Sequence, residues 1–304
     1  MQSVHEGPVA EGATLGHRAG MAFLDHVRLC NTYSLADFVP FRVGPAKVGW
    51  IRRSLSLELR RFGTLFHVFE DLVHLEPELR THADRSAALA EALAALAEDG
   101  VIAGLRGELY PVIERLGGEP LLDIDRAAAP YFGVAHRGFH LNGVVGGGAD
   151  ARMWIARRAL TKTTYPGQLD NMVAGGHPSG LSARENLLKE CAEEAGLPEE
   201  LSARAVPVSM VSYTMESPEG LRRHAFWSYD LQVPEEFTPV PVDGEVHEFT
   251  LMPVDEVARI VETSGEFKYN CNLVVIDWLM RTGRIDPEHP DFHELSIGLH
   301  QPWP

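Results

Sequence analysis

Apolar residues recur along the first half of the chain with both strand and helix periods. The segment 38–51, FVPFRVGPAKVGWI, predicts two short strands that flank a Gly-Pro turn. In the segment 85–100, leucines recur at helical spacing up to Gly100, which predicts a helix that ends there. The segments GELYPVIERL and EPLLDIDRAAAPYFGV predict one or two further strands and a short helix.

From about residue 138 onward, paired apolar runs dominate the pattern. The segment 139–159 contains two such runs around three glycines and predicts a hairpin. A second hairpin is predicted around residues 217–220. In its second arm alternate residues from Ala225 to Val233 are apolar, so one face should be buried. EVHEFTLMP predicts a further strand, whereas VDEVARIV and NCNLVVIDWLMRTG predict helices.

These elements predict an α/β (α+β) chain in which a smaller domain precedes a larger one with a mixed sheet. We expect a flexible tail at 1–20, an α+β accessory domain at 21–135, the main domain at 136–285 and an irregular tail at 286–304. The accessory segment contains no chemical motif that we recognise. Its sequence therefore predicts a packing or lid role.

Composition and charge narrow the range of partners. The 304 residues carry a formal net charge of −16, which disfavours nucleic acid and anionic membrane surfaces. Three widely spaced cysteines predict neither a disulfide framework nor a zinc site. The first twenty residues lack a basic start followed by an apolar run, and no stretch reaches the length of a membrane span. We therefore expect a reduced, soluble, cytoplasmic protein.

The most informative stretch is GGHPSGLSARENLLKECAEEAGL, residues 175–197. Ser182 and Glu185 fit a capping box, and Gly196 fits the position that follows a helix. The sequence therefore predicts a helix over residues 183–195. The glycine-rich loop before it allows a ligand to approach the main chain closely, and it leads into a helix N-terminus, which favours anions.

Three glutamates crowd one side of this predicted helix. At about 100° per residue, Glu194 lies about 40° to one side of Glu190 and Glu193 lies about 60° to the other. Their sector borders the stripe expected to pack inward, formed by Leu187, Leu188, Cys191 and Ala195. Like charges so placed repel, so a hard cation such as Mg²⁺ or Mn²⁺ would stabilise them. The alternative is an ordinary solvated acidic face.

The stretch resembles a Nudix box, whose pattern is G-x5-E-x7-R-E-U-x-E-E-x-G-U with U aliphatic. Residues at the matching positions are Gly175, Glu190, Cys191, Glu193, Glu194, Gly196 and Leu197. Lys189 stands where the pattern has Arg, and Leu181 stands where it has the first Glu. In the family those two positions brace the loop on the helix. Because both are changed together, neither leaves a lone charge, and the metal-binding glutamates remain.

Residues 21–285 further resemble the Nudix proteins with an extra N-terminal domain of the DUF4743 type, related to the Nudix half of fungal thiamine pyrophosphokinase-like proteins. The phrases that carry this resemblance include FVPFRVGPAKVGWIR, FGVAHRGFHLNG, RRALTKTTYPGQLDNMVAGGHPSG and FKYNCNLVVIDWLMRTG. The resemblance implies an α/β/α sandwich and hydrolysis of thiamine-diphosphate-like compounds to monophosphates. Nudix proteins often form homodimers, which is a further expectation.

The resemblance also implies roles for particular residues. Glu190 and Glu193 would be catalytic and, with Glu194, would hold Mg²⁺ or Mn²⁺. Phosphate contacts are expected from four residues: Arg157, Lys162, Gly175 and Gly176. The general base is left open: it would be Glu193 or a loop carboxylate, for which Glu216, Glu245 and Glu248 are the candidates.

Other conspicuous residues are expected to be structural. Arg157 and Arg158 are adjacent in a strand, so only one of them can point inward. Asp170 is interpreted as a turn cap, His177 as a loop residue and Cys191 as a small core residue. Trp154, Trp227 and Tyr213 are expected to pack in the core, with stacking on a heterocyclic substrate ring as the alternative.

Four alternative functions remain open. The small-molecule substrate would be a nucleoside diphosphate or a coenzyme diphosphate if it is not of the thiamine type. Similarity to isopentenyl diphosphate isomerases is a third interpretation, but these carry a reactive cysteine where this chain has Ala174. A ligand sensor without catalysis is suggested by Leu181 and Lys189 and opposed by the three retained glutamates.

Overall fold

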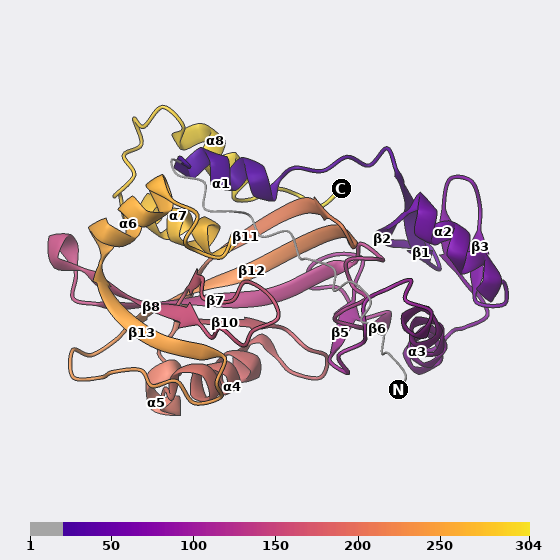
Figure 1. The fold of residues 1–304 in the computed structure, drawn as a ribbon, viewed down its shortest axis with the longest axis horizontal. Helices are drawn as coiled ribbons and strands as arrows, with labels where there is room; N and C mark the ends of the chain where they lie inside the picture. Colours follow the sequence, from indigo (N-terminus) through magenta and orange to yellow (C-terminus); the bar gives the residue numbers. More distant parts are fainter. Residues whose placement is uncertain (1–20) are drawn as a thin grey trace, which may run out of the picture.

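The computed structural model describes residues 21–304, and the tail predicted at 1–20 lies outside them. Two parts lie side by side along the longest axis of the molecule (Figure 1). One contains the first six strands, and the other is built on a larger sheet with helices on both faces. No helix within residues 21–304 combines the length and apolar character that crossing a bilayer requires.

The N-terminal part is an α+β domain, as the sequence predicts. Its four-stranded sheet has the order β2-β1-β4-β3. The bounds are β1 Phe38–Val43, β2 Ala46–Arg52, β3 Phe66–Val68 and β4 Val73–Leu75. A separate two-stranded ribbon pairs β5 (Leu109–Val112) with β6 (Leu122–Asp125). The helices are α2 Arg53–Leu59, the 3₁₀ helix η1 Arg60–Phe62, and α3 His82–Glu98.

Local signals explain where these elements begin and end. The hairpin predicted in 38–51 is confirmed. The predicted helix at 85–100 is also confirmed, but it begins three residues earlier because the side chain of Thr81 accepts a hydrogen bond from the amide of Asp84. The short helix expected after β6 is wrong, since residues 126–133 form turns that pack Phe132 between Phe41 and Phe66.

The larger sheet has the order β11-β12-β7-β8-β13, with β10 paired to β7 and β9 paired to β8. Its strands are β7 Ala135–Val145, β8 Arg152–Arg158, β9 Leu169–Asp170, β10 Val173–Gly176, β11 Val206–Ser217, β12 Gly220–Gln232 and β13 Val246–Pro253. The 3₁₀ helix η2 (Gly148–Asp150) lies between β7 and β8. The sheet is mixed because β12 runs parallel to β7 whereas the other pairs are antiparallel. Both predicted hairpins are confirmed. The expectation of a single buried face on β12 is wrong, since Phe226 and Ser228 are buried as well.

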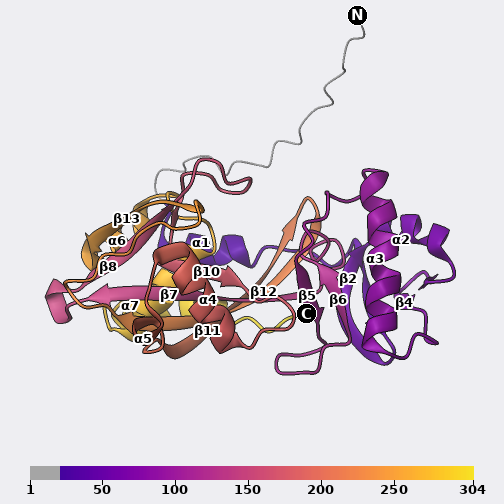
Figure 2. The same cartoon turned by 90° about the horizontal axis from the view of Figure 1, so that it is seen from below.

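Helices cover both faces of this sheet and give a three-layer sandwich (Figures 1 and 2). One face packs against α1 Phe23–Cys30, α6 Val254–Thr263, α7 Cys271–Arg281 and α8 Phe292–Gly298. The other face packs against α4 Ala183–Ala195 and the short α5 Glu199–Ser202. The site described next lies on the α4 face.

Two terminal segments belong to the larger core. Helix α1 buries Phe23 and Val27 against α7 and α8, although it falls in the range expected for the accessory domain. The segment 286–304 is not irregular throughout, because α8 forms there and buries Leu295 and Leu299 at an i, i+4 spacing. Segments from both ends of the described range, α1 and α8, therefore complete the larger core.

Candidate active site

The acidic helix α4 has the boundaries that its sequence predicts. The hydroxyl of Ser182 accepts a hydrogen bond from the amide of Glu185, and the carboxylate of Glu185 accepts one from the amide of Ser182. Gly196 ends the helix in a left-handed conformation with φ of 61°. On the inner face Leu187, Cys191 and Ala195 are buried as expected, whereas Asn186 rather than Leu188 completes the buried set.

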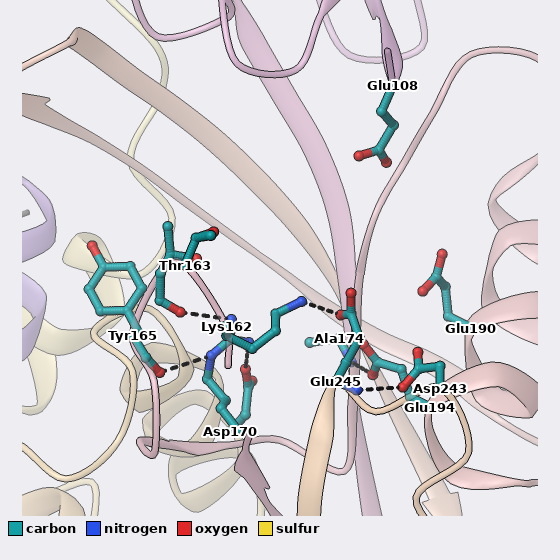
Figure 3. A network of polar contacts seen from close by, with 12 residues as sticks. Glu108, Lys162, Thr163, Tyr165, Asp170, Ala174, Glu190, Glu194, Asp243 and Glu245 are labelled. Atoms are coloured by element: carbon teal, nitrogen blue, oxygen red, sulfur yellow. Dashed lines mark hydrogen bonds and ion pairs between the residues drawn. The ribbon is translucent and has the colours of Figure 1, made fainter. Parts of the chain in front are cut away.

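Two of the three glutamates turn toward strand β10. Glu194 is 8% exposed, and its carboxylate accepts a hydrogen bond of 3.1 Å from the amide of Ala174. Glu190 lies flat against the same strand, since a Cβ placed on Gly175 would come within 2.8 Å of its Cγ. Gly175 is therefore required for the position of Glu190. Figure 3 shows both side chains approaching β10 from α4.

Glu193 is placed differently from its two neighbours. Its side chain is 50% exposed and pairs with Lys189, whose Nζ is 2.6 Å from Glu193 and 3.2 Å from Glu190. This difference follows the helix period, because Glu194 is the nearest of the three glutamates to the inner stripe and Glu193 is the farthest from it. Two carboxylates are directed at the strand, and the third lies at the solvent side with a lysine.

Electrostatics set the inner pair apart. Burial raises the pKa of Glu194 well above its usual range, and the charges of Asp170, Glu190 and Glu245 add to the effect against the Ala174 hydrogen bond. Burial also raises the pKa of Glu190, opposed by Lys189 and reinforced by Glu193 and Glu245. The charged form of Glu194 is therefore compensated only by the Ala174 amide, whereas that of Glu190 is compensated in part by Lys189.

A third carboxylate and a lysine join this pair from the loops around β8 and β13. The Nζ of Lys162 lies 2.5 Å from the carboxylate of Glu245. The carboxylate of Asp243 accepts a hydrogen bond from the amide of Glu245 and fixes this turn. Burial would raise the pKa of Glu245, but Lys162 outweighs it and leaves the pKa lowered. Figure 3 shows Lys162 and Glu245 directed at the space beside Glu194.

Two further candidates for the general base lie elsewhere. Glu216, at the end of β11, accepts from Arg52 at 2.9 Å and from the amide of Ser34. It therefore ties the larger sheet to the N-terminal part. Glu248 lies on β13 and pairs with Arg157 at 3.3 Å. The structure brings only Glu245 together with the glutamates of α4.

Adjacent arginines on β8 point in opposite directions, as the strand period predicts. Arg157 is the outward one, since its contacts are Glu248 and the carbonyl of Gly167. Arg158 is the inward one, but its Nη1 pairs with Asp170 at 3.0 Å. Of the two basic residues expected to contact phosphate, Lys162 therefore lies with the groups near α4, whereas Arg157 does not.

Asp170 is the centre of a buried network rather than a turn cap. Lys268 lies 3.5 Å from it, and the thiol of Cys271 donates to it over 2.7 Å. Burial would raise the pKa of Asp170, but Lys268 and Arg158 outweigh it and hold the pKa well below its usual range. Although Asp170, His140 and Cys271 could geometrically hold a metal ion, the two cations already neutralise this carboxylate.

The N-terminal domain reaches the glycine-rich loop, which its sequence did not reveal. A Cβ placed on Gly176 would lie 1.8 Å from the hydroxyl oxygen of Tyr110 on β5. Ser179 donates its amide to the carbonyl of Leu109 and its hydroxyl to Asp123 at 2.5 Å. The ribbon β5–β6 therefore clamps the loop that follows β10.

Two charged residues of that ribbon border the carboxylates. Glu108 and Arg126 form an ion pair of 2.9 Å, and the guanidinium of Arg126 lies 5.8 Å from the ring of Tyr110. The negative charge of Glu190 contributes to the raised pKa of Tyr110, and the negative charge of Glu245 contributes to the raised pKa of Arg126. In Figure 3 the carboxylates of Glu108 and Glu190 point toward the same space. No motif in the sequence marks these residues, because only the fold brings them to the loop.

The residues expected to be structural largely are. His177 donates from Nε2 to the carbonyl of Leu181 over 2.6 Å, which braces the loop where the Nudix pattern has its Glu–Arg pair. Trp154 and Tyr213 are buried in the two cores. Trp227 packs against the α4-side core with its ring 5.5 Å from that of His177. These contacts favour packing over substrate stacking.

The site therefore combines main-chain glycines, a set of carboxylates and two lysines, Lys162 and Lys189. Carboxylate oxygens at this density are the donors that a hard divalent cation prefers. Lys162 can meet phosphate oxygens, and Glu245 is an ionised carboxylate that can accept a proton. The arrangement suits metal-assisted hydrolysis of an anhydride between phosphates.

Sequence comparisons agree with this chemistry. Residues 143–271 match the family model described as NUDIX domain, and residues 22–136 match the one described as a domain of unknown function, DUF4743. Over 282 residues the chain is 41% identical to Nudix hydrolase 24, chloroplastic, of Arabidopsis thaliana, covering 90% of this chain and 76% of that protein. It is 39% identical over 284 residues to Nudix hydrolase 20, chloroplastic, of the same plant, with the same coverage. The uncharacterized protein YJR142W of Saccharomyces cerevisiae is 33% identical over 221 residues, which are 67% of this chain and 63% of that protein.

Proposed function

We propose a substrate and a mechanism for this chain, which belongs to the Nudix hydrolases and is therefore a pyrophosphohydrolase that acts on a diphosphate. The resemblance inferred from the acidic helix is confirmed, and so are the mixed-sheet Nudix domain and the preceding α+β domain. Members of the family typically use a divalent metal and bind small diphosphate compounds.

We assign Mg²⁺ or Mn²⁺ to Glu190, Glu193 and Glu194. The observation that carries this assignment is geometric: Glu194, which is 8% exposed, and Glu190 both lie against strand β10 from one face of α4, with Glu193 on the adjoining turn. A divalent ion there would stabilise both charged forms, and Glu193 joins by exchanging Lys189 for the ion. When bound, the ion neutralises phosphate oxygens and acidifies a water molecule.

The protein's own groups complete the reaction. Lys162 contacts the phosphate oxygens. The space beside Gly175 and Gly176 is taken by Glu190 and Tyr110, so the two glycines serve to seat these side chains against β10. Glu245, kept ionised by Lys162, accepts the proton of the attacking water. The new bond joins the water oxygen to phosphorus, the bridging P–O bond breaks, and the products are a monophosphate and inorganic phosphate.

The substrate we propose is thiamine diphosphate or a damaged form of it. The site is rich in carboxylates, with Glu108, Asp243 and Glu245 beside those of α4. Such a site disfavours an additional anionic group and favours a cationic heterocycle attached to the diphosphate. A thiazolium ring has that charge, whereas a nucleotide does not. We propose that the ribbon β5–β6, which is seated on the loop after β10, contributes to the contact with this ring.

Phosphate release with Mg²⁺ or Mn²⁺ tests the proposal. The wild-type protein is incubated with thiamine diphosphate, a ring-damaged analogue, ADP, coenzyme A and isopentenyl diphosphate, and products are identified by mass spectrometry. We expect the thiamine-type compounds to give monophosphates with the highest kcat/KM. We expect a chelator to abolish the activity and either metal to restore it.

Variants separate the mechanism from the substrate. Glu193→Gln and Glu194→Gln are expected to lower kcat by about 100-fold or more, whereas Glu200→Gln on the exposed surface of α5 leaves it unchanged. Full activity in both variants would overturn the metal assignment. Preference for ADP or coenzyme A would overturn the substrate and leave the mechanism standing. Isomerised isopentenyl diphosphate would overturn both.

A further inference from the structure

A cavity lies at the junction of the two domains, apart from the carboxylate site. Its volume is about 460 Å³. The lining comes from β2, the loop after β5, strands β11 and β12, and the last residues of the chain. The residues that the argument uses are Lys47, Arg115, Leu116, Met210, Arg223 and Trp303. None of the carboxylates near α4 contributes to it.

The cavity is basic although the protein as a whole is strongly acidic. Lys47, Arg115 and Arg223 line it, and the carboxylates there belong to Glu114 and to the last residue, Pro304. In the part of the chain that the structure describes, none of these three basic residues forms an ion pair with a carboxylate. In a chain with a net charge of −16, three unpaired cations around one cavity are an unusual concentration.

Arg223 is the buried centre of this cluster. It is 3% exposed, and its Nη1 donates to the carbonyls of Val48 and Gly133, each over 3.0 Å. Its Nε is buried and has no acceptor within the described residues. Burial lowers the pKa of Arg223 to about 10. An arginine is rarely buried in this way unless an anion pairs with it.

Lys47, on strand β2, is a second cation of the cavity without a partner carboxylate in residues 21–304. Burial lowers its pKa, and the charges of Arg223 and Arg42 lower it further. Its Nζ lies 4.8 Å from the ring centre of Trp50. The two cations thus face a common space in which they repel each other.

A tryptophan forms an apolar wall beside the cations. The Nε1 of Trp303 donates to the carbonyl of His224, and the guanidinium of Arg223 lies 5.4 Å from its ring centre. The Nε1 of Trp50 donates to the carbonyl of Pro304 and holds the same segment. Leu116 and Met210 add apolar surface to the lining. The cavity therefore offers cationic and apolar walls together.

We propose that this cavity binds a small molecule that carries a phosphate group, at a site separate from the catalytic one. Phosphate oxygens accept hydrogen bonds from Arg223, Lys47 and Arg115, while the organic portion packs against Trp303, Met210 and Leu116. Two arginines with a lysine suit a doubly charged phosphate better than a single carboxylate. The inference does not rest on the substrate proposed above.

Binding of phenyl phosphate to the full chain tests this site. Titrations by calorimetry and by tryptophan fluorescence are made in the presence of a chelator, so that the metal-dependent site does not contribute. We expect one saturable site. We expect the Lys47→Gln and Arg115→Gln variants to bind about tenfold or more weakly, a loss of about 1.4 kcal/mol. Arg80→Gln, at a side chain that is 79% exposed, serves as the matched control.

Further ligands and activity measurements decide the class of molecule. Inorganic phosphate should compete with phenyl phosphate, and benzoate should bind more weakly than phenyl phosphate. Each binding-site variant should retain wild-type diphosphate hydrolysis, which separates this site from the catalytic one. No saturable binding, equal affinity in the variants, or equal binding of benzoate would each overturn the proposal. Failure of diphosphate hydrolysis in the wild-type protein would affect only the proposed function.

Discussion

The hydroxyl of Tyr110 occupies the space in which a side chain on Gly176 would begin. A Cβ at that position would lie 1.8 Å from the hydroxyl oxygen and 2.8 Å from the ring carbon that bears it. The ring of Tyr110 also lies 4.5 Å from that of His136 at the start of β7. The N-terminal domain is therefore seated on the glycine-rich strand, and this contact requires glycine.

Gly176→Ala is expected to separate the two domains locally. Overpacking of this kind costs about 1–3 kcal/mol of stability, and we expect kcat/KM to fall by about tenfold or more because the loop after β10 shifts. Urea unfolding and steady-state kinetics measure the two effects. Gly104→Ala is the control, since a Cβ added there would have no atom within 4 Å and the backbone is not left-handed. A Gly176→Ala protein with wild-type stability and activity would show that Tyr110 does not constrain the strand.

Arg126 offers a test of whether the N-terminal domain contacts substrate. Its guanidinium pairs with Glu108, and its positive charge helps to lower the pKa of Glu245 across the domain boundary. Arg126→Gln removes a cation beside the site where we propose that the phosphates bind, so we expect KM to rise by about tenfold, as for a lost charge-assisted hydrogen bond. Arg204→Gln, on the exposed surface, should leave KM unchanged. An unchanged KM in Arg126→Gln would restrict this domain to a structural role.

The pH dependence of hydrolysis tests the role of Glu245. Burial raises its pKa and Lys162 lowers it, with the lowered value as the net result. Removing the lysine in Lys162→Met therefore raises the pKa of Glu245. If Glu245 accepts the proton, the acidic limb of kcat/KM moves to higher pH, because the carboxylate must be ionised. Glu248→Gln should not move that limb. An acidic limb that stays in place in Lys162→Met would remove Glu245 as the base.

Glu194 should make the metal-free protein less stable as the pH rises. The ordinary pKa of this carboxyl is 4.5, and burial raises it well above that value in the fold. Its contribution to stability is therefore full below pH 4.5 and is lost as the pH rises through the raised pKa. Glu194→Gln has no carboxyl to ionise there, so it does not lose this stability. In chelator, at the upper end of the pH range, its melting temperature should therefore exceed that of the wild-type protein.

Adding a divalent metal ion tests the same carboxyl in a second way. Because Mg²⁺ or Mn²⁺ binds the folded protein, it should raise the wild-type melting temperature at neutral pH. The increase should be smaller in Glu194→Gln, and Glu200→Gln should behave as the wild type. Identical pH profiles in chelator for the wild-type and Glu194→Gln proteins would show that this carboxyl is not strained in the fold.

Local signals are sufficient to predict much of the fold. Helix α4 begins at the residue after Ser182 and ends before Gly196 because the capping box and the left-handed glycine are sequence-local features. The hairpins of the larger sheet are predicted by alternation and turn residues for the same reason. The resemblance to a Nudix box supplies the function of the helix, which neither spacing nor charge would have fixed.

Long-range contacts explain what the sequence could not predict. Tyr110 and Arg126 reach the loop only because the ribbon β5–β6 folds over it, and neither residue belongs to a motif. The outward position of Glu193 follows from the helix period, since it lies farthest of the three glutamates from the inner stripe, and Lys189, one helical turn away, pairs with it there. Asp170 resembles a turn cap in the sequence because Lys268, its partner, is remote along the chain.

The buried network at Asp170 should be the most sensitive electrostatic site in the protein. Its carboxylate lies 3.0 Å from Arg158 and 3.5 Å from Lys268, and all three side chains are largely buried. Asp170→Asn leaves two buried cations without a counter-ion, and breaking such a pair costs about 3–5 kcal/mol. Urea unfolding at neutral pH measures the loss. Arg157→Gln, which removes an exposed pair with Glu248, should cost at most about 1 kcal/mol. Equal losses in the two variants would mean that water reaches Asp170 and screens its charge.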